Sequence, residues 1–115
     1  SFNQNRTLID EDELILIEES IKYKDVCSYH HEFVNVGKKL RNYWFYAITN
    51  EIPLAGYRKD NKDGLNQENI SLSLFDNLKH PCVVYFYDGN IKDPLMSHYD
   101  ILYQNQKGAI LKKQN

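Results

Sequence analysis

Apolar residues recur at helical spacing in the first third of the chain. Leu14, Ile17 and Ile21 share one helical face, and a run of acids precedes them, where the positive end of a helix dipole favours negative charge. Residues 10–24 also fit a strand that is apolar on both faces, so a helix and a strand both remain possible here. Residues 28–41 give a clearer apolar stripe, which predicts an amphipathic helix. The apolar positions of that stripe are Tyr29, Phe33, Val36 and Leu40.

Alternation with a period of two dominates the rest of the chain. Residues 42–48 place aromatic and aliphatic side chains on both sides, as in a strand that is covered on both faces. Residues 70–74 alternate apolar and hydroxyl side chains as a half-buried strand does, although a helix over 69–78 fits as well. Residues 81–87 form the strongest strand pattern and end at an Asp-Gly-Asn turn. Two further strands are predicted at 99–103 and 109–112.

Together these elements predict an α+β fold, with one or two N-terminal helical segments packed on a largely antiparallel sheet of about five strands. Residues 1–9 are polar and lack a period, so we expect a flexible arm. Residues 10–115 are then a single globular domain. The apolar phases of the pattern give the expected core, which comprises Phe33, Leu40, Phe45, Ile48, Leu72, Leu74, Val84 and Phe86.

Composition narrows the functional classes. The 115 residues include 14 basic and 16 acidic side chains, a net charge of −2, so the chain lacks the positive excess typical of nucleic-acid-binding domains. No apolar run reaches the ~18 residues that a membrane span requires. We therefore expect a soluble domain that does not enter a membrane. A glycine-rich phosphate-binding loop is missing from the sequence, and we predict no cofactor.

The cysteines and histidines suggest metal chemistry at first sight. Cys27 lies three residues before His30, and His80 lies two before Cys82; thiolates and imidazoles are the ligands that zinc prefers. Their spacing fits no zinc motif, so we predict no metal site. Two cysteines are also too few for a disulfide scaffold. We expect reduced thiols in an intracellular, cytoplasmic protein, although the sequence leaves their pairing open.

Three segments carry a family resemblance. An apolar stretch at 70–75, the strand pattern at 81–85 and the step His98-Tyr99-Asp100 follow one another. In this order they resemble the closing part of ovarian-tumour-type cysteine proteases, which cleave ubiquitin linkages. The resemblance covers about a third of the chain and implies that His98 is a general base.

The same resemblance implies a nucleophile. Cys27, which follows an Asp-Val step, keeps the cysteine of the family motif but lacks its Gly-Asn pair. Asp100 lies two residues from His98 and would point the same way on a strand, where it could orient the imidazole ring of a Cys–His pair. A second alignment puts Tyr43 at the position of the nucleophile, and that arrangement would be inert.

Aromatic residues offer a different kind of site. They stand near a basic stretch and include Tyr43, Trp44, Tyr46 and Tyr57. Single-strand nucleic-acid binders combine such rings with cations. Residues 10–19, however, hold six acids and no base, which would repel phosphate. A single-stranded nucleic-acid-binding domain therefore remains only an alternative.

Protein binding fits the same residues better. Trp and Tyr dominate the energetics of protein interfaces, and the acidic residues 10–19 would steer a basic partner toward the chain. We therefore predict a non-catalytic protein-interaction or subunit module, with a protein partner or a second copy of the chain. The hydrolase that uses Cys27, His98 and Asp100 is the main alternative.

Overall fold

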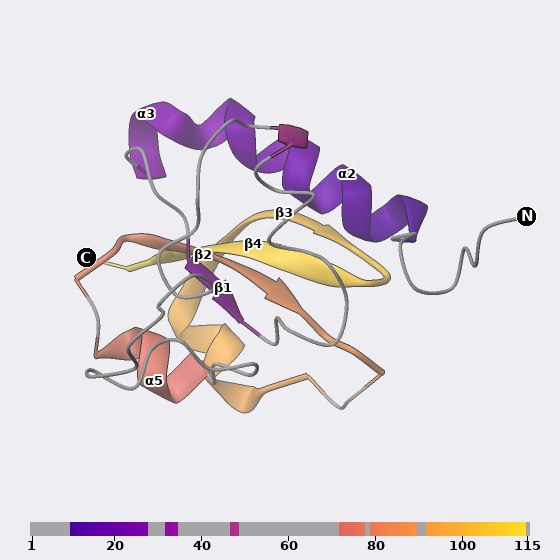
Figure 1. The fold of residues 1–115 in the computed structure, drawn as a ribbon. Coiled ribbons are helices and arrows are strands. Elements are labelled where there is room, and N and C mark those ends of the chain that lie inside the picture. Colours follow the sequence, from indigo (N-terminus) through magenta and orange to yellow (C-terminus); the bar gives the residue numbers. More distant parts are fainter. Residues whose placement is uncertain are drawn as a thin grey trace, which may run out of the picture.

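The described part of the molecule has three layers. The structure is a computed structural model that describes residues 10–27, 32–34, 47–48, 72–77, 79–89 and 92–114. A helical segment covers one face of a sheet, and shorter helices lie on the other face (Figure 1). Among the described residues, no helix has the length and apolar character needed to cross a bilayer.

The N-terminal helical segment consists of α2 (Glu11–Ser20), η1 (Ile21–Tyr23) and α3 (Lys24–Cys27). Asp10 and Glu13 form a capping box at its start, in which the Asp10 backbone N–H donates to Glu13 Oε1 at 3.3 Å. Such a box satisfies backbone groups that a helix leaves unbonded at its N-terminus. The helical interpretation of residues 10–24 is therefore confirmed.

The buried face of α2 differs from the predicted one. It consists of Glu13, Leu16, Ile17 and Ser20, whereas the sequence pattern favoured Leu14, Ile17 and Ile21. Leu14 and Ile21 are only half-buried. A helix with apolar residues at four consecutive positions offers two faces of similar hydrophobicity, so the sheet that it packs against decides between them.

The described sheet has the strand order β1-β2-β4-β3. Its strands are β1 (Glu32–Val34), β2 (Cys82–Phe86), β3 (Tyr99–Asn105) and β4 (Gly108–Lys113). The last three pair antiparallel, whereas β1 pairs parallel to β2. The α+β class is confirmed. The described sheet, however, has three antiparallel strands and one short parallel strand, and not about five strands.

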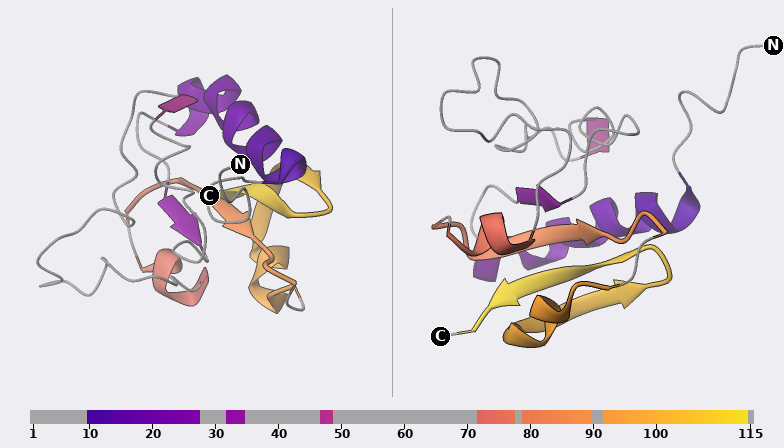
Figure 2. Two further views of the ribbon diagram at one scale, coloured as in Figure 1. Left: turned by 45° about the vertical axis from the view of Figure 1, so that its right-hand side comes forward. Right: turned by 90° about the horizontal axis from the view of Figure 1, so that it is seen from below.

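Strand β2 separates two apolar clusters. Val84 and Phe86 face α2 and pack with Leu16, Ile17 and Ile110. Val83 and Tyr85 face the opposite side, toward the short helices α5 (Leu72–Asp76) and η3 (Pro94–His98). Successive side chains of a strand point to opposite faces, so a strand that is apolar throughout contributes to both clusters. Figure 2 shows α2 on one side of the β3–β4 hairpin and α5 and η3 on the other.

Three secondary-structure elements predicted from the sequence are wrong in the part of the chain that the structure describes. Residues 32–34 form a strand and not part of a helix over 28–41. Residues 72–76 are helical, so the helical alternative for 69–78 is confirmed and the strand at 70–74 is not. Ala47 and Ile48 are helical too, whereas the pattern predicted a strand up to Ile48. The pattern of residues 69–78 fits two periods, and tertiary packing selects the helical one; at 32–34 and 47–48 packing overrides the local pattern.

The expected core is confirmed for three of the four residues whose side chains are described. Leu72, Val84 and Phe86 are buried, and Ile48 is partly buried against the cluster that includes Leu16. The remaining four expected residues lie outside the described side chains: Phe33, Leu40, Phe45 and Leu74. The predicted arm, residues 1–9, also lies outside the described part.

Candidate functional site

The aromatic binding residues predicted from the sequence cannot be placed. Tyr43, Trp44, Tyr46 and Tyr57 lie outside the described residues. The next described residues along the chain are Ala47 and Ile48, and the partly buried Ile48 packs against the α2-side cluster. The candidate site is therefore built from the helical segment 11–27 and the sheet beneath it.

The cysteines are paired with each other. Cys27 ends α3, Cys82 begins β2, and a disulfide joins them with Cα atoms 5.3 Å apart. The expectation of reduced thiols is therefore wrong for this structure, because helix packing brings together two residues that are 55 positions apart. The cytoplasmic location predicted from reduced thiols loses that support.

The other two proposed catalytic residues lie at the surface. His98 ends η3 and Asp100 is the second residue of β3, and both side chains are exposed. The register places Asp100 opposite Lys112 of β4, and Lys112 opposite Cys82 of β2. One strand thus separates Asp100 from Cys82, which spaces the two backbones by roughly 10 Å. The hydrogen bond to the Asp100 carboxylate comes from Gln114 Nε2, at 3.3 Å.

The described residues contain no group of three or more His, Cys, Asp or Glu side chains that could hold a metal ion. Cys27 and Cys82 are disulfide-bonded, so neither offers the thiolate that zinc would require. His30, the other residue of the first pair, lies outside the described part.

The outer side of α2 is strongly acidic. Glu11 and Glu18 are exposed, and Asp12 and Glu19 are partly exposed. No basic residue occurs in the last turn of α2, and its first turn carries Glu11, Asp12 and Glu13. Acids in a first turn interact favourably with the helix dipole, so Glu11, Asp12 and Glu13 stabilise the helix, whereas Glu18 and Glu19 lie near its C-terminus and add charge without that benefit.

Two lysines partly compensate this charge. Lys22 Nζ lies 2.7 Å from Glu19 Oε2, and this hydrogen bond raises the pKa of Lys22. Lys107, in the turn between β3 and β4, lies 3.2 Å from Asp10 Oδ2, which likewise raises the pKa of Lys107. Both lysines are exposed, so these pairs contribute little to stability.

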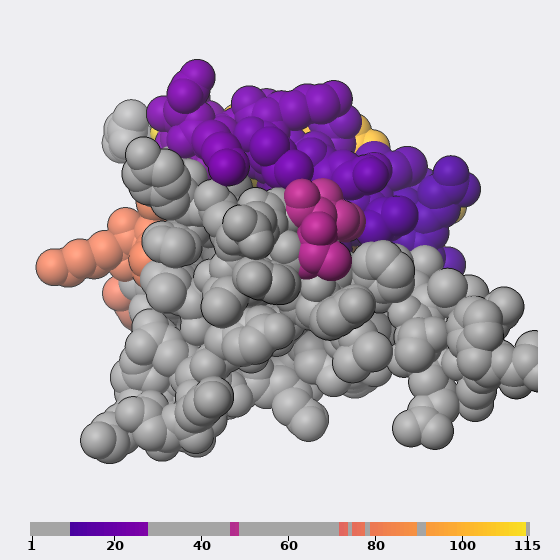
Figure 3. Space-filling model, turned by 45° about the horizontal axis from the view of Figure 1, so that its top comes forward, coloured from indigo at the N-terminus to yellow at the C-terminus, as the bar shows by residue number. Residues whose placement is uncertain are grey.

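Apolar side chains accompany the acids. Leu14, Ile15 and Ile21 are half-buried, and Val26 is 49% exposed. In Figure 3 the segment 11–27 forms a continuous ridge along one side of the molecule, next to Ala47 and Ile48. We call residues 11–26 of this ridge the acidic helical surface.

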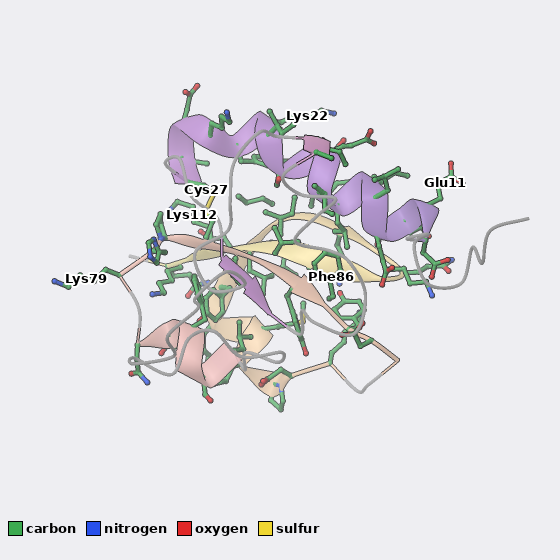
Figure 4. The ribbon with its side chains drawn as sticks, viewed as in Figure 1. Glu11, Lys22, Cys27, Lys79, Phe86 and Lys112 are labelled. Atoms are coloured by element: carbon green, nitrogen blue, oxygen red, sulfur yellow. A yellow bond between two sulfur atoms is a disulfide. The ribbon has the colours of Figure 1, made fainter. Side chains whose placement is uncertain are left out.

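Basic residues gather at the opposite end of the molecule. In Figure 4 Glu11 lies at one end, whereas Lys79 and Lys112 lie toward the other, with Lys112 near Cys27. Lys113 follows Lys112, and its ammonium lies 4.5 Å from the centroid of the Phe75 ring. Burial lowers the pKa of Lys113. Acids are thus concentrated near the start of α2, where Lys107 also lies, whereas the end with the lysines also carries the exposed Asp25 and Asp100.

Strand β3, at the edge of the described sheet, is protected against strand addition. A bulge interrupts its register between Ile101 and Tyr103, and the Tyr23 hydroxyl donates to the Leu102 carbonyl oxygen at 3.0 Å. Bulges and occupied backbone groups reduce the capacity of an edge to pair with another strand. Ile101 is nevertheless 48% exposed. The acidic helical surface, and not this edge, is therefore the better candidate for a binding surface.

Comparison with protein-family models, with curated proteins and with solved structures finds no match to this chain.

Proposed function

We propose that this chain is a non-catalytic protein-interaction or subunit module whose acidic helical surface receives a cationic protein segment. One observation carries the proposal: Glu11 and Glu18 are exposed on a helix that the sheet holds in place from beneath. Fixed charges of one sign raise the association rate of an oppositely charged partner.

The chemistry of the surface defines the partner. Within the described part, Glu11, Glu18 and Asp25 form no ion pair, so their charges remain available to Lys or Arg side chains. Ile15 lies between Glu11 and Glu18 along the helix and Val26 follows Asp25, so both offer apolar surface beside these acids. A segment that alternates cationic and apolar side chains would complement both properties.

The predicted aromatic residues extend the proposal. Ala47 and Ile48, which directly follow Tyr46 in sequence, lie beside the helical segment. We propose that Tyr43, Trp44, Tyr46 and Tyr57 contribute to the same interface, since buried Tyr and Trp side chains provide much of the affinity in protein complexes.

The test compares two charge reversals of equal size. Glu18→Lys changes the acidic helical surface, and Asp100→Lys makes the same change on β3. The probe is a fluorescent peptide of alternating Lys and Leu, titrated at low and at physiological salt. We expect Glu18→Lys to weaken binding about three- to tenfold at low salt, and less at higher salt because ions screen exposed charges. Asp100→Lys should bind like the parent.

Three outcomes would contradict the proposal. Equal affinity of the Glu18→Lys variant and the parent would remove the acidic helical surface from the interaction. Tighter binding of a single-stranded oligonucleotide than of the peptide would favour the nucleic-acid alternative. Salt-sensitive self-association that excludes the peptide would instead make the partner a second copy of the chain.

The ovarian-tumour-like hydrolase remains an alternative for a reduced chain. It requires a free Cys27 thiolate, whereas Cys27 is bonded to Cys82. An electrophilic ubiquitin probe should label Cys27 of the reduced chain, and His98→Ala should prevent that labelling. If the reduced chain is not labelled, this alternative fails.

A further inference from the structure

The disulfide lies where two distant parts of the fold meet. Cys27 and Cys82 are both fully buried, at 0% exposure. Figure 4 shows the sulfur–sulfur bond beneath the end of α3, between the helical segment and the sheet. Cys82 opens β2, whose five residues are all buried. The bond therefore ties a helix end to an interior strand of the sheet.

The end of the helical segment is short and largely exposed outside Cys27. Helix α3 has four residues, of which Cys27 alone is buried. Asp25 is exposed and Val26 is 49% exposed. Further back, the Tyr23 hydroxyl donates a hydrogen bond to the Leu102 carbonyl oxygen. The disulfide is therefore the covalent attachment of α3 to the sheet.

The bond has the properties of a structural disulfide. Both cysteines of the chain are used, so no third thiol exists to exchange with the bond. Thiol–disulfide exchange requires a thiolate to approach one sulfur atom directly. Because both cysteines are buried, a reductant reaches them only after local opening.

We propose that the Cys27–Cys82 bond is a permanent clamp, and that the chain folds and functions in an oxidising compartment. In forming the bond, the two protein thiols react with a small-molecule or protein disulfide, RSSR. The products are the protein disulfide and two RSH molecules, so two electrons and two protons pass to the oxidant. Reducing cytosol drives this exchange backwards, whereas secretory and periplasmic compartments maintain it. The inference does not depend on what the acidic helical surface binds.

The experiment produces the full chain in two bacterial compartments, in the cytosol and, behind a cleavable export signal, in the periplasm. A maleimide traps free thiols at lysis, and mass spectrometry counts the labelled cysteines. We expect no label on the periplasmic chain and two labels on the cytosolic chain. The oxidised chain, treated with dithiothreitol, should lose the bond at least tenfold faster in denaturant than in native buffer.

Stability provides the second measurement. A loop of this length suggests that the reduced chain populates its unfolded state roughly 30- to 1,000-fold more than the oxidised chain, and proteolysis should accelerate accordingly. The variant Cys27→Ser/Cys82→Ser should match the reduced chain. Free thiols in the periplasmic chain would overturn the proposal. So would rapid reduction in native buffer, or equal protease resistance of the oxidised chain and the double variant.

Discussion

Gly108 begins β4, where it lies close both to the backbone of β2 and to Leu16 of α2. A Cβ atom at this position would overlap the backbone oxygen of Tyr85 and lie 2.8 Å from Leu16 Cδ1. A leucine methyl group can move, but the Tyr85 oxygen belongs to the backbone of β2 and is fixed by the sheet. Replacing Gly108 by Ala must therefore displace β4 relative to β2.

The loss of stability in Gly108→Ala follows from this displacement. Inserting a methyl group into a packed interior costs about 1–3 kcal/mol. Moving the start of β4 also weakens a ladder hydrogen bond, which is worth about 1 kcal/mol. We expect Gly108→Ala to lower the free energy of unfolding by about 2–4 kcal/mol. Since about 1 kcal/mol shifts the midpoint by roughly 4 °C in a domain of this size, the melting temperature should fall by about 8–16 °C.

Gly89 provides a matched control. It adopts a positive φ of 74°, and a Cβ atom there would have no neighbour within 4 Å among the residues that the structure describes. Gly89→Ala therefore costs only the left-handed backbone conformation, about 1 kcal/mol. Both variants are compared by thermal and denaturant unfolding of the oxidised chain. If Gly108→Ala destabilises no more than Gly89→Ala, the close approach of the start of β4 to the backbone of β2 is refuted.

Two further predictions concern the two sides of the sheet. Truncating the fully buried Phe86 to Ala should lower the free energy of unfolding by about 3–5 kcal/mol, and an unchanged denaturant midpoint would contradict its place in the core. Replacing Tyr99 by Phe removes the hydroxyl that donates to Asp76 Oδ1 at 2.9 Å, at a cost of about 1–2 kcal/mol at pH 7. Burial and the bonded Asp76 carboxylate raise the pKa of Tyr99, so above about pH 10 the unfolded chain releases this proton first and the parent loses stability. The phenylalanine variant does not lose this stability. The difference in the free energy of unfolding between the parent and Tyr99→Phe should therefore shrink as the pH rises through 10. If denaturant unfolding gives the same difference at pH 8 and at pH 11, the role of Tyr99 is contradicted.

The strands of the second half were predictable from local pattern. Residues 81–87 form an apolar run that ends at Asp88 and Gly89, and both of these residues adopt positive φ. A run that can be buried on both faces and stops at a residue pair tolerant of left-handed backbone allows few alternatives. The hairpin of β3 and β4 likewise follows from two apolar segments joined by a short polar turn.

Elements with two compatible periods were not predictable in this way. In residues 72–76 the apolar positions fit both a strand and a helix, and Leu72 and Phe75 become core residues by their helical spacing. The stretch around Phe33 fits a helical stripe, yet residues 32–34 pair with β2. The choice between helix and strand depends on the segment that packs against these residues, and that segment comes from another part of the chain.

Local sequence pattern predicts the candidate site even less well than the fold. The acidity of residues 10–19 is visible in the sequence, but its exposure depends on which face of α2 meets the sheet. The Cys27–Cys82 bond depends on contact across 55 positions, and no local spacing encodes such proximity. A cysteine at the start of a buried strand, together with a second cysteine near a helix end, was the one available signal.

Both ends of the helical segment are attached to the sheet, and this has a consequence for binding. At the first end, the Asn105 side chain donates to the Asp12 carbonyl oxygen at 2.9 Å, and Lys107 pairs with Asp10. At the other end, Cys27 is bonded to Cys82. A surface that is fixed before binding loses little conformational freedom when a partner arrives. Breaking the disulfide would free the end that carries Asp25 and Val26. It would thereby lower the affinity for cationic partners although no charge on the helical segment changes.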